Sequence, residues 1–212
     1  MWSDLTPAWQ ACLELAWEAY CDDCIPIGAV VTDEQGMVLS RGRNRVYPRS
    51  MWKQHPIGTE ISHAEVEALR GLDYSRADHH QYSLFSTTEP CPMCMGTFYM
   101  SGVRNLYYAA RDPWAGSINL LGTTLYLSRK PVKTFGPEVL LEMIVTGLFV
   151  EQDCWMHAGT LPEGDFYRKM RDVLPEAVEY GVRLWQSGEV QKSRREAIPA
   201  EAMFNRLVLL VK

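Results

Sequence analysis

The sequence predicts an α/β protein in which a mixed β-sheet carries helices on its faces and a helical segment follows at the C-terminal side. Two apolar runs around a turn predict a β-hairpin between residues 25 and 43. Strand-like and helix-like segments then alternate up to residue 110, which favours a sheet covered by helices. The 212 residues, 47% apolar and 22% charged, suffice for one domain with a buried core and a smaller additional unit.

The first elements are predicted from a helix start and a turn. Thr6 followed by Pro7 is typical of a helix N-terminus, because Thr caps the free backbone N–H groups and Pro suits the first turn. Apolar residues then recur at helical spacing: Trp9, Leu13, Ala16, Trp17 and Tyr20. Residues 25–32 suit a strand, residues 33–36 a turn, and residues 37–43 the partner strand.

A loop and several shorter elements are predicted next. Residues 44–62 contain Pro48, Pro56 and Gly58 without periodicity, which indicates a loop. We expect Ser62 to cap a helix over residues 63–70. The remaining elements are a strand at 82–87, a helix at 90–101 ended by Gly102, a strand at 104–110, and helices at 138–152 and 164–186.

The domain organisation follows from this order of elements. We predict one domain over residues 1–130 and a helical C-terminal extension over residues 131–212 that packs on it. The last apolar residues, 207–211, are compatible with a strand or a helix.

Two short clusters carry the chemistry: His63-Ala64-Glu65 and Pro90-Cys91-Pro92-Met93-Cys94. One imidazole and two thiolates are three of the four ligands that Zn²⁺ prefers, and catalytic zinc sites leave the fourth position to water. The combination of His-x-Glu with a later Pro-Cys-x-x-Cys is a signature of zinc deaminases. We therefore predict that His63, Cys91 and Cys94 bind zinc.

The positions of these residues in the predicted helices support that chemistry. Cys91 and Cys94 fall in the first turn of a helix, where free N–H groups favour the thiolate and a spacing of three puts both sulfurs on one side. Zinc lowers the pKa of a bound water to about 7. Glu65, two residues after His63, is predicted to be the catalytic acid and base that moves the protons.

Residues 25–122 resemble the cytidine deaminase-like superfamily, and within it the branch of bacterial tRNA adenosine deaminases and guanine deaminases. The segments that carry the resemblance are Pro26-Ile27-Gly28-Ala29-Val30-Val31, Gly42-Arg43-Asn44-Arg45, His63-Ala64-Glu65, Thr88 to Gly96 and Ala110-Arg111-Asp112. The resemblance implies a three-layer α/β/α fold with about five strands, usually assembled as a homodimer. It also implies that Asn44 and the Ala64 backbone N–H bind substrate.

The resemblance leaves the substrate open. The Pro-Cys-Pro-Met-Cys motif with Gly96 and Tyr99 is more similar to guanine deaminases, whereas Ala-Arg-Asp followed by residues 115–117 is more similar to the tRNA enzymes. We expect a free nucleobase or nucleoside, of purine or cytosine type, as substrate, because the net charge is −5. A tRNA wobble adenosine is the alternative substrate. A non-catalytic zinc-stabilised interaction module is an alternative of another class.

Several other residues have a functional and a structural interpretation. One basic cluster either binds phosphate or an RNA backbone, or forms a solvated strand edge and loop: Arg41, Arg43, Arg45, Arg49 and Lys53. Trp52 and Trp114 either stack on a base or pack, and Trp114 is taken as the candidate. Cys21 and Cys24 are more typical of small buried residues than of a second metal site. The basic residues Lys192, Arg194 and Arg195 are expected at a solvated helix end.

The N-terminal residues lack a basic region followed by an apolar stretch, and the most apolar segment, 139–150, contains Glu142 and is too short to cross a bilayer. We therefore expect a cytoplasmic protein without membrane attachment, in which the cysteines are reduced.

Overall fold

Five strands form one mixed β-sheet in the order β2-β1-β3-β4-β5. The computed structural model describes residues 1–46, 59–75 and 79–211. The strands are β1 (Gly28–Thr32), β2 (Val38–Arg43), β3 (Ser83–Thr88), β4 (Asn105–Ala110) and β5 (Lys133–Phe135). β1 pairs antiparallel with β2 and β3, whereas β3 with β4 and β4 with β5 are parallel. The predicted α/β class with a mixed sheet of about five strands is confirmed.

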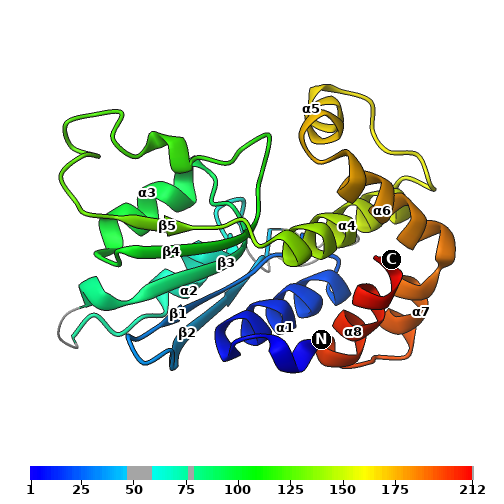
Figure 1. Cartoon of the computed structure of the whole chain (residues 1–212), viewed down its shortest axis with the longest axis horizontal. Helices are drawn as coiled ribbons and strands as arrows, with labels where there is room; N and C mark the ends of the chain where they lie inside the picture. The colour runs from blue at the N-terminus through cyan, green and yellow to red at the C-terminus, as the bar shows by residue number, and fades with distance from the viewer. Residues whose placement is uncertain (47–58, 76–78, 212) are drawn as a thin grey trace.

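Helices cover both faces of this sheet, as Figure 1 shows. α1 (Pro7–Cys21) and α4 (Val139–Met156) pack on one face, and α2 (Ala64–Arg70) and α3 (Pro92–Ser101) pack on the other. The alternation of side chains along the strands explains this division. Val30, Phe85 and Tyr107 belong to the core on the α1 and α4 side, and Val31, Leu84 and Leu106 to the core on the α2 and α3 side.

The predicted helix start at Thr6 is confirmed, because the Thr6 hydroxyl accepts a hydrogen bond from the backbone N–H of Trp9 at 3.4 Å. Among the described residues, three short 3₁₀ segments precede or connect the longer elements: η1 (Trp2–Asp4), η3 (His79–Gln81) and η4 (Ile118–Leu120). The predicted helix end at Gly102 is confirmed as well, and Gly102 adopts the left-handed backbone (φ 95°) that favours glycine there.

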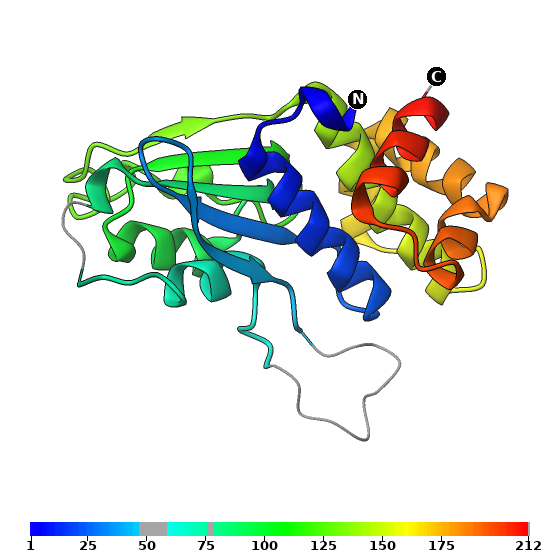
Figure 2. The same ribbon diagram turned by 90° about the horizontal axis from the view of Figure 1, so that it is seen from below.

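The C-terminal helices gather beside α1 at one end of the sheet (Figure 2). They are α4, α5 (Asp165–Val173), α6 (Pro175–Ser187), α7 (Glu189–Arg195) and α8 (Ala200–Leu210). The prediction of one helix over residues 164–186 is wrong, because the chain leaves the helical conformation at Leu174 (φ −130°, ψ 50°). Pro175 has no N–H and disfavours the helical conformation in the residue before it, so α6 begins anew at Pro175.

Residues 207–211, for which strand and helix were both open, lie at the end of α8, with Leu207 buried. None of the described helices combines the length and the apolarity needed to span a membrane.

β5 belongs to the sheet although it follows residue 130. The division into domains at residues 1–130 and 131–212 stays a prediction.

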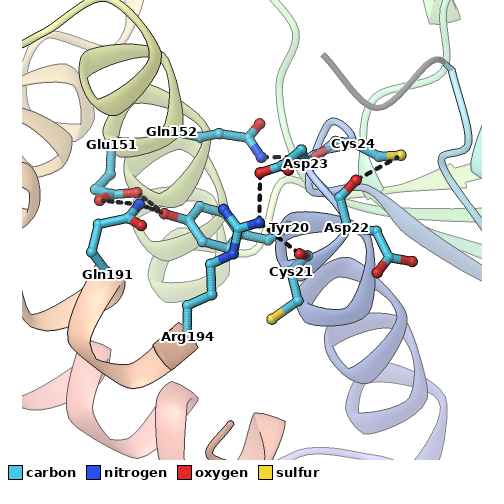
Figure 3. Close-up of polar contacts among 9 residues, drawn as sticks. All are labelled: Tyr20, Cys21, Asp22, Asp23, Cys24, Glu151, Gln152, Gln191 and Arg194. Atoms are coloured by element: carbon cyan, nitrogen blue, oxygen red, sulfur yellow. Dashed lines mark hydrogen bonds and ion pairs between the residues drawn. The ribbon is translucent and has the colours of Figure 1, made fainter. Parts of the chain in front are cut away.

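A polar contact network fastens the C-terminal helices to the turn after α1 (Figure 3). Arg194 of α7 forms an ion pair with Asp23 at 2.6 Å and donates a hydrogen bond to the backbone carbonyl of Cys21 at 2.8 Å. Gln152 of α4 donates to the carbonyl of Cys24 at 2.9 Å. The expectation that Arg194 is a solvated helix-end residue is wrong, because its side chain is only 21% exposed.

Candidate active site

The first residues of α2 carry the His-x-Glu motif. His63 is the N-cap residue, and Ala64 and Glu65 begin the helix, so Ser62 is not the cap that we expected. The Ser62 hydroxyl instead accepts a hydrogen bond from the backbone N–H of Thr59 at 3.0 Å. α2 can lie directly on β2 because Gly42 has no side chain, and a Cβ there would come within 2.2 Å of the Ala64 carbonyl oxygen. This close packing positions the motif next to the sheet.

The Pro-Cys-x-x-Cys motif lies where β3 leads into α3. Cys91 is the N-cap of α3, Pro92 is its first residue and Cys94 lies in its first turn. β2 and β3 both run antiparallel to β1 and therefore point the same way, so the helices that follow them, α2 and α3, begin at one edge of the sheet. The two motifs therefore meet at this edge.

The three candidate ligand atoms form a compact triangle. Cys91 Sγ lies 3.6 Å from His63 Nδ1 and 3.5 Å from Cys94 Sγ, and Cys94 Sγ lies 3.5 Å from His63 Nδ1. The centre of such a triangle is roughly 2.0 Å from each corner, so a point slightly out of its plane matches the Zn–N and Zn–S distances of about 2.0–2.3 Å. One nitrogen and two sulfurs also form a donor set that zinc accepts. These residues fit a zinc ion.

The electrostatics of the triangle favour a thiolate at neutral pH. Hydrogen bonds from Cys94 and from His63 lower the pKa of Cys91 to about 4, against the opposing effect of burial. A thiolate rather than a thiol binds a metal ion. The same contact raises the pKa of Cys94, so Cys91 is the first of the two thiols to ionise.

Glu65 lies directly beside the triangle. Its side chain is 3% exposed, its carboxylate lies 3.3 Å from Cys94 Sγ, and it accepts a hydrogen bond from the Ser86 hydroxyl at 3.1 Å. Burial raises the pKa of Glu65 above its ordinary value. A carboxyl group with a raised pKa is suited to accept and return a proton near neutral pH. Ser86, which the sequence did not single out, orients this carboxylate.

Asn44 follows β2 and offers a hydrogen-bond donor to the same space. Its side chain is 1% exposed, its Oδ1 accepts from the backbone N–H of Val46 at 3.0 Å, and its Nδ2 has no hydrogen-bond partner among the described residues. An unpaired buried donor is costly unless a ligand satisfies it. Asn44 is thus placed to bind an acceptor atom of a substrate.

A cavity of about 1050 Å³ connects these residues with the C-terminal helices. His63, Glu65, Cys91 and Asn44 line it from the sheet side. The opposite side, which we call the extension wall, consists of Val145, Thr146, Phe149, Phe166, Tyr167 and Met170 from α4 and α5. The sequence signal for these residues was only that of apolar helices, so the extension wall was not predicted.

The family follows from this site and from the sequence match. The model of the cytidine and deoxycytidylate deaminase zinc-binding region matches residues 3–110. The chain belongs to this family. The protein is a zinc-dependent hydrolytic deaminase, and zinc is its cofactor, in agreement with the His63, Cys91 and Cys94 triangle.

Curated relatives of this deaminase act on different substrates. A probable cytosine deaminase of Schizosaccharomyces pombe is 27% identical over 57% of the chain and 75% of the relative. A tRNA-specific adenosine deaminase of Rickettsia bellii is 26% identical over 76% of the chain and 97% of the relative. A guanine deaminase of Bacillus subtilis is 32% identical over 48% of the chain and 60% of the relative. The predicted superfamily and branch are confirmed.

Among solved structures, the deaminase is similar to the protein NE0047 in complex with 2,6-diaminopurine. The TM-score is 0.51 at 25% identity, and the match covers 68% of this chain and 79% of the other. The similarity supports the cytidine deaminase-like fold predicted from the sequence.

The other candidate residues of the deaminase have different surroundings. Trp114 is 57% exposed and contacts the ring of Phe166 edge-on, with ring centroids 6.2 Å apart. Arg41 and Arg43 form ion pairs with acidic residues of α1 or the turn after it: Arg41 with Glu14 at 3.2 Å, and Arg43 with Asp22. Arg45 is exposed.

Arg49, Lys53 and Trp52 lie outside the described residues. Burial raises the pKa of the Cys21 thiol to about 11 and also raises that of Cys24, so both stay protonated at neutral pH. This agrees with their interpretation as small packing residues.

Proposed function

We propose that the deaminase removes an exocyclic amine from a free nucleobase or a nucleoside, of purine or cytosine type, and releases it as ammonia. The observation that carries this proposal is the buried Glu65 carboxylate, 3.3 Å from Cys94 Sγ, beside the His63, Cys91 and Cys94 triangle. The named relatives that act on cytosine, guanine and tRNA adenosine support the same reaction type.

In the proposed mechanism each residue has one task. His63 Nδ1 and the sulfurs of Cys91 and Cys94 hold the zinc ion, which as a Lewis acid makes water nucleophilic at neutral pH. The Glu65 carboxylate takes one proton from the attacking water and delivers it to the ring nitrogen. It then takes the second proton, from the hydroxyl group on the tetrahedral carbon, and delivers it to the departing amine. Water and the amino-heterocycle thereby become the oxo-heterocycle and ammonia.

Asn44 and Ala64 bind and orient the ring in this proposal. Asn44 Nδ2 donates to a ring acceptor, and the backbone N–H of Ala64, in the first turn of α2, contacts the base. Trp114 contributes to substrate binding indirectly, because its ring contacts Phe166 of the extension wall. We further propose that the protein works in the cytoplasm as a homodimer.

The test is ammonia release from a panel of bases and nucleosides by zinc-loaded protein. We expect at least one cytosine, guanine or adenine derivative to be deaminated in a zinc-dependent manner. No release from any member of a panel that spans these rings would contradict the proposal.

A tRNA wobble adenosine remains the second candidate, supported by the relative from Rickettsia that aligns over 97% of its length. Arg41 and Arg43, two of the arginines expected to bind RNA, instead form ion pairs with acidic residues of α1 and the turn after it. These ion pairs argue against RNA as the substrate. Binding of an anticodon hairpin that weakens steeply with salt would favour RNA. Absence of binding at low salt would exclude it.

A further inference from the structure

The cavity is larger than a free base requires. Its volume of about 1050 Å³ slightly exceeds the roughly 300–1,000 Å³ of cavities that bury most of a drug-sized ligand. On the sheet side, Asn44 offers a hydrogen-bond donor and Glu65 an acid to the ring of a substrate. The remaining space adjoins the extension wall.

The extension wall presents aromatic surface to that space. The ring centroids of Phe149 and Phe166 are 5.8 Å apart, and those of Phe166 and Tyr167 are 5.0 Å apart. Phe149 and Phe166 are only partly buried, so part of each ring is open to a ligand. Such surface binds an apolar or planar group through dispersion and stacking.

The contacts of Figure 3 hold this wall in place. Gln152 of α4 is bonded to the carbonyl of Cys24, and Arg194 of α7 is paired with Asp23, which itself lines the cavity. α4 therefore cannot move away from the turn after α1 without breaking these contacts. The wall is a fixed part of the cavity.

The charges around the cavity oppose an anionic ligand. Six acidic residues line it: Asp23, Glu65, Glu89, Asp112, Asp153 and Glu163. The described arginine in the lining, Arg111, is bound by Glu142, which accepts hydrogen bonds from Nε and Nη2 at 2.8 Å each. Its charge is thereby neutralised, as that of Asp23 is by Arg194, and the other acidic residues of the lining disfavour a phosphate group.

We propose that the extension wall forms a second subsite, which binds an uncharged substituent on the ring of the substrate. The inference rests on the proposed deaminase function and narrows its substrate to non-phosphorylated nucleosides or ring-substituted bases. The amino-heterocycle is bound by Asn44 beside Glu65, and its substituent contacts Phe149 and Phe166. A nucleotide is a poor substrate.

The first experiment compares substrates that share a ring. We would measure kcat and KM of the zinc-loaded full chain for the base, the N-benzyl base, the nucleoside and its 5′-monophosphate, in cytosine, guanine and adenine series. In the series that turns over, we expect the substituted forms to exceed the free base at least tenfold in kcat/KM. The monophosphate should fall at least tenfold below the nucleoside. The proposal would be overturned if kcat/KM for the free base equalled or exceeded that for the substituted forms. It would also be overturned if kcat/KM for the monophosphate equalled or exceeded that for the nucleoside.

The second experiment removes aromatic surface from the wall. Phe166→Ala, and Phe149→Leu as a milder change in case the helix packing suffers, should raise KM for the substituted base at least fivefold and change the free base less than twofold. Phe135→Ala is the matched control, because Phe135 is 41% exposed on β5 and does not line the cavity. Calorimetry should show the same difference in Kd: the variants should weaken binding of the substituted deaminated product more than binding of the unsubstituted one. Equal losses for both substrates would contradict a separate subsite.

The third experiment changes the charge at the rim. Glu163 is exposed and lines the cavity, so Glu163→Lys should leave the fold intact and raise the monophosphate-to-nucleoside ratio of kcat/KM at least fivefold, with Glu163→Gln in between. An unchanged ratio would contradict the electrostatic part of the proposal. Absence of turnover in every series would refute the deaminase function itself, whereas turnover without these preferences would refute only the subsite.

Discussion

The two sides of the cavity are built in different ways. The sheet side consists of polar residues that begin helices or follow strands and that make side-chain hydrogen bonds: His63, Glu65, Cys91 and Asn44. The extension wall consists of apolar and aromatic residues on α4 and α5. Polar groups fixed in a buried position perform chemistry, whereas apolar surface selects ligands by shape. Changes on the sheet side should therefore lower kcat, and changes on the extension wall should raise KM.

The largest effect is expected for removal of a metal ligand on the sheet side. Cys94→Ala should abolish both zinc binding and turnover, because two protein ligands do not hold the ion against competing water. Zinc content by mass spectrometry and ammonia release are the measurements. Cys154→Ala, which removes an equally buried thiol from α4, should retain both. A Cys94→Ala protein with one equivalent of zinc would contradict the assignment.

The next effect separates metal binding from proton transfer. Glu65→Gln should keep zinc and lose roughly 10²–10⁴-fold in kcat, the range that general acid–base catalysis contributes. Glu67→Gln serves as the control, since Glu67 is paired with Arg70 on the same helix at 3.2 Å. Undiminished turnover in the Glu65 variant would exclude its role as the proton carrier.

A smaller effect is expected for the contacts that hold the extension wall. Arg194→Ala should lower the free energy of unfolding by about 1–3 kcal/mol, because it leaves Asp23 without the ion pair. KM for substituted substrates should rise while kcat stays within twofold. Urea denaturation and steady-state kinetics test this, with the exposed neighbour Arg195→Ala as control. Equal stability of the two variants would mean that the contact does not fasten the wall.

The smallest effect concerns the pH dependence of stability. Burial raises the pKa of Glu151 above its ordinary 4.5, although Tyr20 and Gln191 donate hydrogen bonds to its carboxylate. The folded state therefore favours the protonated form, and the free energy of unfolding falls as the pH rises through the raised pKa. Glu151→Gln should flatten this decline above pH 4.5, whereas Glu201→Gln on the surface should not. Parallel curves for wild type and Glu151→Gln would contradict the assignment.

The sheet side could be predicted from the sequence because its residues belong to two short motifs at helix starts. His63 and Glu65 are two residues apart, and Cys91 and Cys94 three, so local helix geometry already brings the members of each pair together. The one local error, Ser62 as the cap, displaced the helix start by a single residue.

The extension wall could not be predicted, because Phe149 and Phe166 face Asn44 and His63 only through the packing of α4 on the sheet. Periodicity identifies an apolar helix without saying which partner it meets. Pro175 indicates the break between α5 and α6, but the helical periodicity continues on both sides of it. The ion pair of Arg194 with Asp23 joins residues 171 positions apart, for which no local pattern exists.

The central claim is that one zinc ion lies between His63, Cys91 and Cys94 with Glu65 beside it. X-ray diffraction from crystals of zinc-loaded protein, with anomalous data at the zinc absorption edge, tests it most directly. We predict one peak within about 2.0–2.3 Å of His63 Nδ1 and of both sulfurs, facing the Glu65 carboxylate. A peak at another location, or no peak between these three atoms, would contradict the account.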